Sequence, residues 1–265
     1  MTEAFTSQRG LHVERGGAGE RLLVLLHGMG ANTSVWTRLK PFIEAQWDGR
    51  WLAPDFRGHG RSLCEGPYGY GVHAADIASL MAEESAADVT LLGHSFGGLV
   101  AALIGSGWFG IKPRRVATVG VKIVWTADEI EKALDVSRRP ARGFDTRAEA
   151  IERALKVAGL FGLMDPHSPA AGIGVRERDG KFWLAFDQRA TGGVGPSVET
   201  ILKLCAAPLR LAAGVDDPMV ALADMQRIDP AAVAISDAGH NAHWEAPEAV
   251  WRFFEEGEAS FRDAV

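Results

Sequence analysis

Cysteine, long apolar runs and clusters of basic residues are all scarce in this chain of 265 residues. Its two cysteines, Cys64 and Cys205, show no spacing typical of a metal site or a redox pair, so we interpret them as unpaired thiols in a reducing compartment. No apolar run approaches the ~18 residues of a membrane span. The N-terminus lacks a basic region followed by an apolar stretch, so we expect no secretion signal and a cytoplasmic protein.

The charge and the histidine pattern exclude further classes of partner. Lysine and arginine number 28 against 34 aspartates and glutamates, a net charge of −6, so we expect neither nucleic acid nor a membrane as partner. The eight histidines form no His-x-x-x-His pair and no cluster with cysteine. Gly28 and Gly30 are not followed by the Gly-Lys-Ser/Thr of a phosphate loop. We therefore predict no metal and no cofactor; the sequence does not indicate the oligomeric state.

Apolar strands alternate with helical patterns over most of the chain. The segment 21–26 is apolar almost throughout, which is typical of a strand buried on both faces. This alternation predicts an α/β protein with a mostly parallel, doubly wound sheet. The predicted strands are 11–15, 21–26, 51–54, 89–92, 115–124, 208–213 and 232–235. The predicted helices are 32–46 (kinked or split at Pro41), 73–86, 98–106, 198–204, 220–227 and one starting at Pro247.

The alternation breaks between Trp125 and Glu199. This stretch contains two helical patterns, at 127–137 and 146–158, and then a loop rich in glycine and proline. Two short strands, 175–178 and 181–186, flank an Asp-Gly pair that is typical of a hairpin turn. We predict that residues 125–199 form a mainly helical insertion over a core made of residues 1–124 and 200–265.

Polar side chains follow the ends of the predicted strands. Because the carboxyl ends of parallel strands share one edge of a sheet, these side chains can converge on a ligand site. Ser95 lies on a strand-to-helix turn, and Gly93 and Gly97 supply the small residues that such a tight turn needs. The residues that follow strands in this way are His27, Asp55, Ser95, Asp216, Asp217 and His240.

A serine hydroxyl needs a base to become a nucleophile, and the base needs an acid to orient it. His240 is the candidate base, ahead of His243, which lies farther into the same loop and lacks a preceding glycine. Asp216 and Asp217 both follow a strand as candidate acids. The resulting chain order of serine, acid and histidine is the one expected for this kind of turn.

The sequence contains four separated motifs: His27-Gly28-Met29-Gly30, the loop from Asp55 to Ser62, the segment from Gly93 to Gly98, and Gly239-His240 followed by Glu245-Ala246-Pro247-Glu248. Together they resemble the α/β-hydrolase superfamily, and the resemblance spans nearly the whole core. It implies that Ser95 is the nucleophile and His240 the base, and that Asp217, three residues after the glycine that ends its strand, is the acid. It also implies that the backbone N–H groups of Met29 and Phe96 form the oxyanion hole.

The same resemblance implies that the insertion is a cap over the site. Its large side chains either line an acyl or aromatic pocket or form the cap's own core. His27 is a further candidate for substrate contact, although His27 and His94 are better interpreted as loop-bracing residues. Lys122 either meets an anionic group or extends along the surface. The candidate pocket residues in the insertion are Trp125, Phe144, Leu160, Phe161, Met164, Trp183 and Phe186.

The favoured function is hydrolysis of a carboxylic ester of a small or medium apolar molecule. The same residues would also serve lactone, amide or diketone hydrolysis, or perhydrolysis. Ser95 in place of aspartate argues against epoxide hydrolase and haloalkane dehalogenase chemistry. A ligand-binding protein without activity is the alternative of another class. The choice of substrate cannot be predicted, because it depends on how the cap packs.

Overall fold

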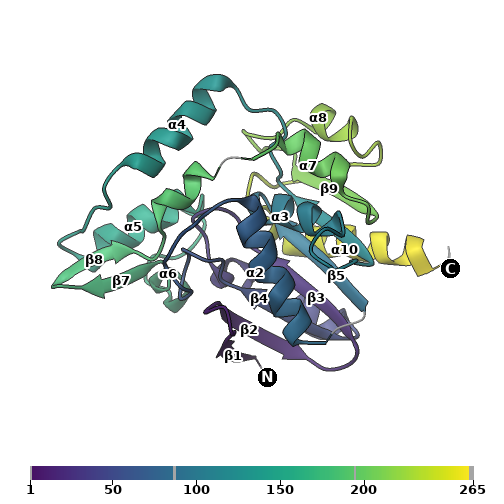
Figure 1. The fold of residues 1–265 in the computed structure, drawn as a ribbon, viewed down its shortest axis with the longest axis horizontal. Coiled ribbons are helices and arrows are strands. Elements are labelled where there is room, and N and C mark those ends of the chain that lie inside the picture. Colours follow the sequence, from purple (N-terminus) through teal and green to yellow (C-terminus); the bar gives the residue numbers. More distant parts are fainter. Residues whose placement is uncertain (1, 86–87, 194, 263–265) are drawn as a thin grey trace.

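An eight-stranded sheet forms the centre of the protein in the computed structural model, which describes residues 2–85, 88–193 and 195–262 (Figure 1). The strand order is β1-β2-β4-β3-β5-β6-β9-β10. Neighbours from β4 to β10 run parallel, while β1 and β2 form an antiparallel edge. The predicted α/β class with a mostly parallel sheet is confirmed. The strands are Glu3–Thr6 (β1), His12–Gly17 (β2), Arg21–Leu26 (β3), Arg50–Pro54 (β4), Asp88–His94 (β5), Arg115–Val119 (β6), Leu209–Gly214 (β9) and Val233–Ile235 (β10).

Helices cover both faces of the sheet, which explains why the central strands are apolar throughout. Leu22 and Leu26 of β3 pack into the core on one face, beneath α2, α3 and α7. Leu23 and Leu25 pack on the other face, beneath α1 and α10. The helices of the core are Lys40–Gln46 (α1), Tyr70–Glu83 (α2), Phe96–Gly105 (α3), Val198–Leu204 (α7), Leu222–Gln226 (α8), Ala242–Glu245 (α9) and Pro247–Arg262 (α10).

Several element boundaries differ from those predicted. The helix expected over 32–46 is split into a 3₁₀ turn, Thr33–Trp36 (η1), and α1, which has Pro41 in its first turn. Strand β6 ends at Val119 because Gly120 takes φ +71° and turns the chain away. Strand β1 was not predicted. The expected end of α2, Ala86, lies outside the described residues.

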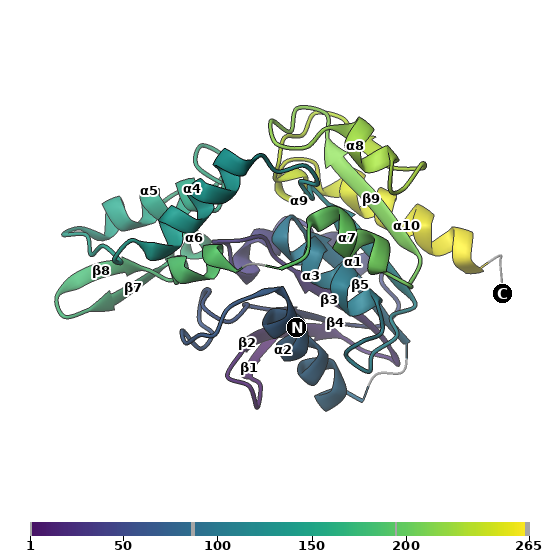
Figure 2. The ribbon, with the colours of Figure 1, turned by 45° about the horizontal axis from the view of Figure 1, so that its top comes forward.

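The segment between β6 and α7 lies outside the main sheet and projects from one side of it (Figure 2). Its hairpin is anchored, since the Asp187 N–H donates to Gly58 O and the Gly60 N–H donates to Ala185 O, both at 2.7 Å. The helix α4, in contrast, buries none of its side chains and packs mainly on η2. The elements are Ala127–Arg138 (α4), Arg147–Val157 (α5), Pro169–Gly172 (α6), Val175–Arg178 (β7), Lys181–Leu184 (β8) and Gln188–Gly192 (η2).

No helix within the described residues is long and apolar enough to cross a membrane.

Candidate active site

Ser95 occupies the sharp turn between β5 and α3 in a strained backbone conformation, with φ 50° and ψ −116°. Such a conformation costs of order 1–3 kcal/mol for a residue with a side chain, so the surroundings must enforce it. The two flanking glycines make the turn possible. A β-carbon at Gly93 would lie 2.5 Å from backbone atoms of Gly97, and one at Gly97 would lie 2.5 Å from the carbonyl oxygen of His27. Only glycine fits either position.

His240 and Asp217 form a hydrogen-bonded pair at the ends of neighbouring strands. His240 Nδ1 lies 2.8 Å from Asp217 Oδ2, and the carboxylate is fully buried while the imidazole is 17% exposed. The other oxygen of Asp217 accepts from the Met219 N–H at 2.8 Å. Asp216, the alternative acid, is exposed, whereas Asp217 is buried. The structure therefore places Asp217, rather than Asp216, where it orients the imidazole.

The loop that carries His240 is braced from behind by Glu245. Its carboxylate accepts from the N–H groups of Gly239 and Asn241, both at 3.1 Å. Gly120 allows the loop backbone to approach closely, because a β-carbon there would lie 3.1 Å from the carbonyl oxygen of His240. The imidazole is thus fixed by its backbone as well as by Asp217.

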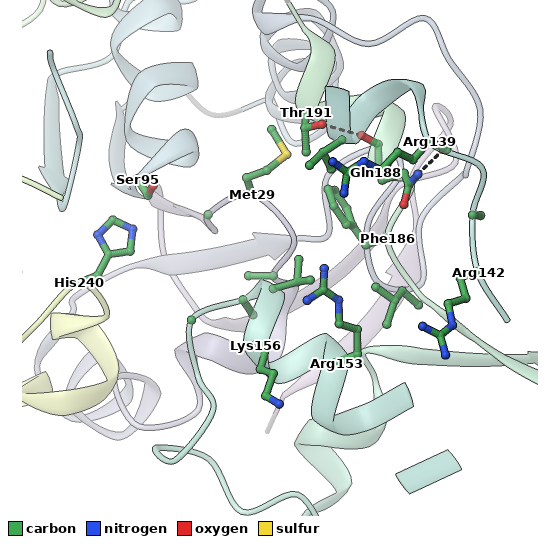
Figure 3. A pocket seen from close by; sticks show the side chains of 18 of the residues that line it. Met29, Ser95, Arg139, Arg142, Arg153, Lys156, Phe186, Gln188, Thr191 and His240 are labelled. Atoms are coloured by element: carbon green, nitrogen blue, oxygen red, sulfur yellow. Dashed lines mark hydrogen bonds between the residues drawn. The ribbon is translucent and has the colours of Figure 1, made fainter. Parts of the chain in front are cut away.

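Ser95 and His240 lie together at one end of a cavity of about 1110 Å³ (Figure 3). The cavity is bounded on one side by the sheet edge and on the other by the segment between β6 and α7. Apolar atoms make up most of its lining, and Met29, Val157 and Phe186 are among the residues that contribute them. A bound molecule could therefore reach the hydroxyl and the imidazole at once.

Two backbone N–H groups are candidates for an oxyanion site beside Ser95. Phe96 is the first residue of α3, and the first N–H groups of a helix have no partner within it. Their position at a helix N-terminus also favours negative charge. Met29 lines the cavity from the turn after β3, in which the Ala31 N–H closes onto Gly28 O at 3.2 Å. Both predicted residues are therefore beside the serine.

Three other histidines surround the site without replacing His240. The His94 ring donates its Nε2–H to the carbonyl oxygen of His240 at 2.9 Å, and burial holds the pKa of His94 well below the usual value. His243 is fully buried, with its ring centre 4.2 Å from the ring centre of His94, and desolvation lowers the pKa of His243 to about 3. His27 holds the backbone of Gly28 and accepts from the Phe56 N–H at 3.0 Å; burial lowers its pKa to about 4. These neutral rings brace the loops.

The loop of Asp55 and Arg57 is structural as well. Asp55 is fully buried and accepts from the N–H groups of Thr33 at 2.7 Å and Arg61 at 2.8 Å. Arg57 makes a bidentate contact with buried Asp76, at 2.7 and 2.9 Å. These bonds fix the loop on which the hairpin of the inserted segment is anchored.

Only part of the predicted pocket set lines the cavity. Trp125, Phe144, Trp183 and Phe186 do so, and Lys122 does as well, in an ion pair with Glu129.

The remaining predicted positions are corrected by the structure. His27 is completely buried behind the turn and is not part of the cavity wall. Leu160 and Met164 are buried in the core cluster beneath α1 and α10, and Phe161 is 55% exposed beside Lys156. Apolar character alone could not separate wall, core and surface at these positions.

Several lining residues were not predicted. They include Gln188, Thr191 and Met219, together with the charged residues Arg139, Arg142, Arg153 and Lys156. These side chains are scattered along the sequence and form no motif, so only the packing of the inserted segment reveals them. Within the described part of the chain, no three histidine, cysteine, aspartate or glutamate side chains group as metal ligands.

The chain is similar in sequence to known proteins over part of its length. A family model described as alpha/beta hydrolase family matches residues 23–253. The lipase LipV of Mycobacterium tuberculosis is 29% identical over 160 residues, 59% of this chain and 58% of the lipase. The pimeloyl-[acyl-carrier protein] methyl ester esterase of Edwardsiella ictaluri is 40% identical over 85 residues, 32% of this chain and 31% of that enzyme. The chain thus matches less than two thirds of the length of each relative.

Solved structures match the chain over nearly its full length. The thioesterase domain from the curacin biosynthetic pathway superposes with a TM-score of 0.76 at 18% identity, covering 94% of this chain and 97% of that domain. E-2-(acetamidomethylene)succinate hydrolase superposes with a TM-score of 0.74 at 23% identity, covering 96% and 100%. At these identities the similarity concerns the fold.

Proposed function

Because this chain belongs to the alpha/beta hydrolase family, we propose that it hydrolyses a carboxylic ester of a small or medium molecule through an acyl-enzyme on Ser95. The observation that carries the proposal is the meeting of Ser95 and the His240–Asp217 pair at one end of the same cavity. A strained serine, an oriented imidazole and a buried carboxylate are the parts that nucleophilic acyl transfer requires.

In the first half of the proposed reaction, Ser95 Oγ attacks the ester carbonyl carbon while His240 Nε2 takes the hydroxyl proton. The carbonyl oxygen gains the electron pair, and the N–H groups of Met29 and Phe96 stabilise the negative charge. When the tetrahedral intermediate collapses, the carbon–oxygen bond to the alcohol breaks, and the alcohol leaves with the proton from His240. The acyl group remains on Ser95.

In the second half, water attacks the acyl-enzyme and gives its proton to His240. Collapse of the second intermediate releases the carboxylic acid, and Ser95 regains its proton from His240. Asp217 accepts the Nδ1–H bond throughout, which leaves Nε2 toward the serine and stabilises the imidazolium as it forms. No other reactant is needed.

The inserted segment, residues 125–199, is proposed to act as the cap that selects the substrate. It contributes the apolar side chains of Phe144, Trp183 and Phe186 to the lining of the cavity. Two relatives are an esterase and a lipase by name, which supports ester hydrolysis as the class of reaction. The strong sequence similarity covers only part of each of them, so their own substrates are not transferred.

Labelling by a fluorophosphonate, together with hydrolysis of 4-nitrophenyl butanoate, tests the proposal. We expect rapid labelling of the wild-type protein, and Ser95→Ala should abolish it and lower kcat by at least about 10³-fold. Ser106→Ala, at the opposite end of α3, is the control and should keep both signals. Full ester hydrolysis by Ser95→Ala would refute the mechanism. Folded wild-type protein that does not label would instead favour a ligand-binding role.

A further inference from the structure

The described residues that line the cavity include positively charged side chains but no negatively charged one. Among the described residues that line the cavity are three arginines and two lysines, but no aspartate or glutamate. The whole chain has the opposite balance, with 34 acidic and 28 basic side chains. A concave surface lined by one sign of charge concentrates ligands of the other sign.

The two lysines are already paired with carboxylates, whereas the arginines are not. Lys122 contacts Glu129, and this contact lowers the pKa of Glu129 to about 2. Lys156 Nζ lies 2.5 Å from Glu152. Within the described part of the chain, the guanidinium groups of Arg139, Arg142 and Arg153 have no carboxylate partner. We call these three residues the arginine wall.

The arginine wall lies across the cavity from Ser95 and His240 (Figure 3). Arg153 projects into the cavity from α5, whose other face is buried through Ile151 and Leu155.

Arg139 follows α4, where the Gln188 side chain donates to its carbonyl oxygen. Thr191 adds a hydrogen bond to Ala133 O at 3.1 Å, so η2 holds the end of α4 in place. The Arg142 guanidinium lies 5.3 Å from the Phe144 ring centre. An aromatic face orients an arginine without cancelling its charge.

From this arrangement we infer that the arginine wall binds an anionic group at the end of the acyl chain remote from the scissile ester. The inference rests on the proposed function and makes the substrate a monoester of a dicarboxylic acid. Guanidinium groups bind carboxylates through two parallel hydrogen bonds. The apolar side chains of Met29 and Phe186 lie between Ser95 and the wall (Figure 3), and they suit a chain of methylene groups.

A matched pair of substrates isolates the charge. Methyl hydrogen adipate and methyl hexanoate have the same chain length and scissile bond, and released methanol is measured for both. We expect kcat/KM to be about tenfold higher for the adipate monoester, mainly through KM, because the guanidinium groups are exposed enough for solvent to weaken each contact. The ratio of the two kcat/KM values should fall as salt is added, because salt screens the attraction between the guanidinium groups and the carboxylate.

Substitution of the three arginines then tests whether they cause the preference for the charged ester. In Arg139→Gln/Arg142→Gln/Arg153→Gln the ratio of the two kcat/KM values should fall to near one. Arg138→Gln is the matched control, because Arg138 precedes Arg139 in the chain, pairs with Asp135 and does not line the cavity. It should keep the wild-type ratio. A methyl ester with a terminal phosphate is the third substrate and shows whether the wall prefers carboxylate or phosphate.

The outcomes separate this inference from the proposed function. Equal kcat/KM values for adipate and hexanoate esters in a wild-type protein that labels at Ser95 would overturn the inference alone. So would a preference that survives the triple substitution, and a strong preference for phosphate would overturn the carboxylate assignment. Wild-type protein that neither labels nor cleaves any ester would overturn the proposed function. Protection of Ser95 from labelling by adipate, lost in the triple variant, supports the wall independently of turnover.

Discussion

Replacing Gly97 by alanine tests whether close packing at the start of α3 holds Ser95 in its strained conformation. A β-carbon at this position would lie 2.5 Å from the carbonyl oxygen of His27 and closer still to that of Leu26. Ordinary contact begins at 3.4 Å, whereas the Leu26 oxygen would lie 2.0 Å away, so backbone atoms would have to move by about 1.4 Å. Both oxygens belong to the end of a central strand and cannot rotate away. We therefore expect Gly97→Ala to lower the free energy of unfolding by about 3 kcal/mol.

Urea unfolding measures this loss, and thermal unfolding should show a Tm lower by about 6–12 °C. The rate of fluorophosphonate labelling at Ser95 should fall as well, because the turn can no longer close. Gly71→Ala is the control, since Gly71 lies in α2 with no atom within 4 Å of the added carbon. That substitution should stabilise the helix by about 0.5 kcal/mol. Equal unfolding midpoints for the two variants would refute the packing argument.

Two further substitutions test the acid and one buried histidine, His73 of α2. Asp217→Asn should lower kcat by about 10³–10⁴-fold with little change in KM, whereas Asp216→Asn should not; similar losses in both would contradict the assignment of the acid. Burial lowers the pKa of His73 to about 3, below its value of ~6.5 in the unfolded chain, so its contribution to stability is complete above pH 6.5. It is lost as the pH falls toward 3, at up to about 1.4 kcal/mol per pH unit. His73→Phe should flatten this part of the pH dependence in urea titrations, and an unchanged slope would refute the explanation.

The core of the fold could be predicted because its strands are buried on both faces. A strand such as β3 is therefore apolar on both faces and can be recognised as a continuous apolar run. The tight turn at Ser95 can be recognised as well, because it requires glycine at fixed positions. Strand β1 lacks such a signal. It is an antiparallel edge strand with mostly exposed side chains, so its pairing with β2 leaves no apolar pattern in the sequence.

The meeting of the candidate catalytic residues could be predicted for a related reason. Ser95, Asp217 and His240 each follow a strand of one parallel sheet, and the topology alone brings such positions to one edge. The choice between Asp216 and Asp217 needed more than topology. It depends on which side chain the turn after β9 buries against His240, and adjacent residues in a turn point in different directions.

The arginine wall could not be predicted, because its position is a property of packing alone. Lys122 is a charged residue near the end of a predicted apolar strand, but in the structure it forms an ion pair with Glu129. Arg139 and Arg142, in contrast, lie in an exposed polar connection that looks unremarkable in the sequence. Their alignment with Arg153 depends on how η2 and α5 hold that connection over the sheet. The core thus positions Ser95, Asp217 and His240, whereas the inserted segment supplies the arginine wall, so the two groups of residues can be changed separately.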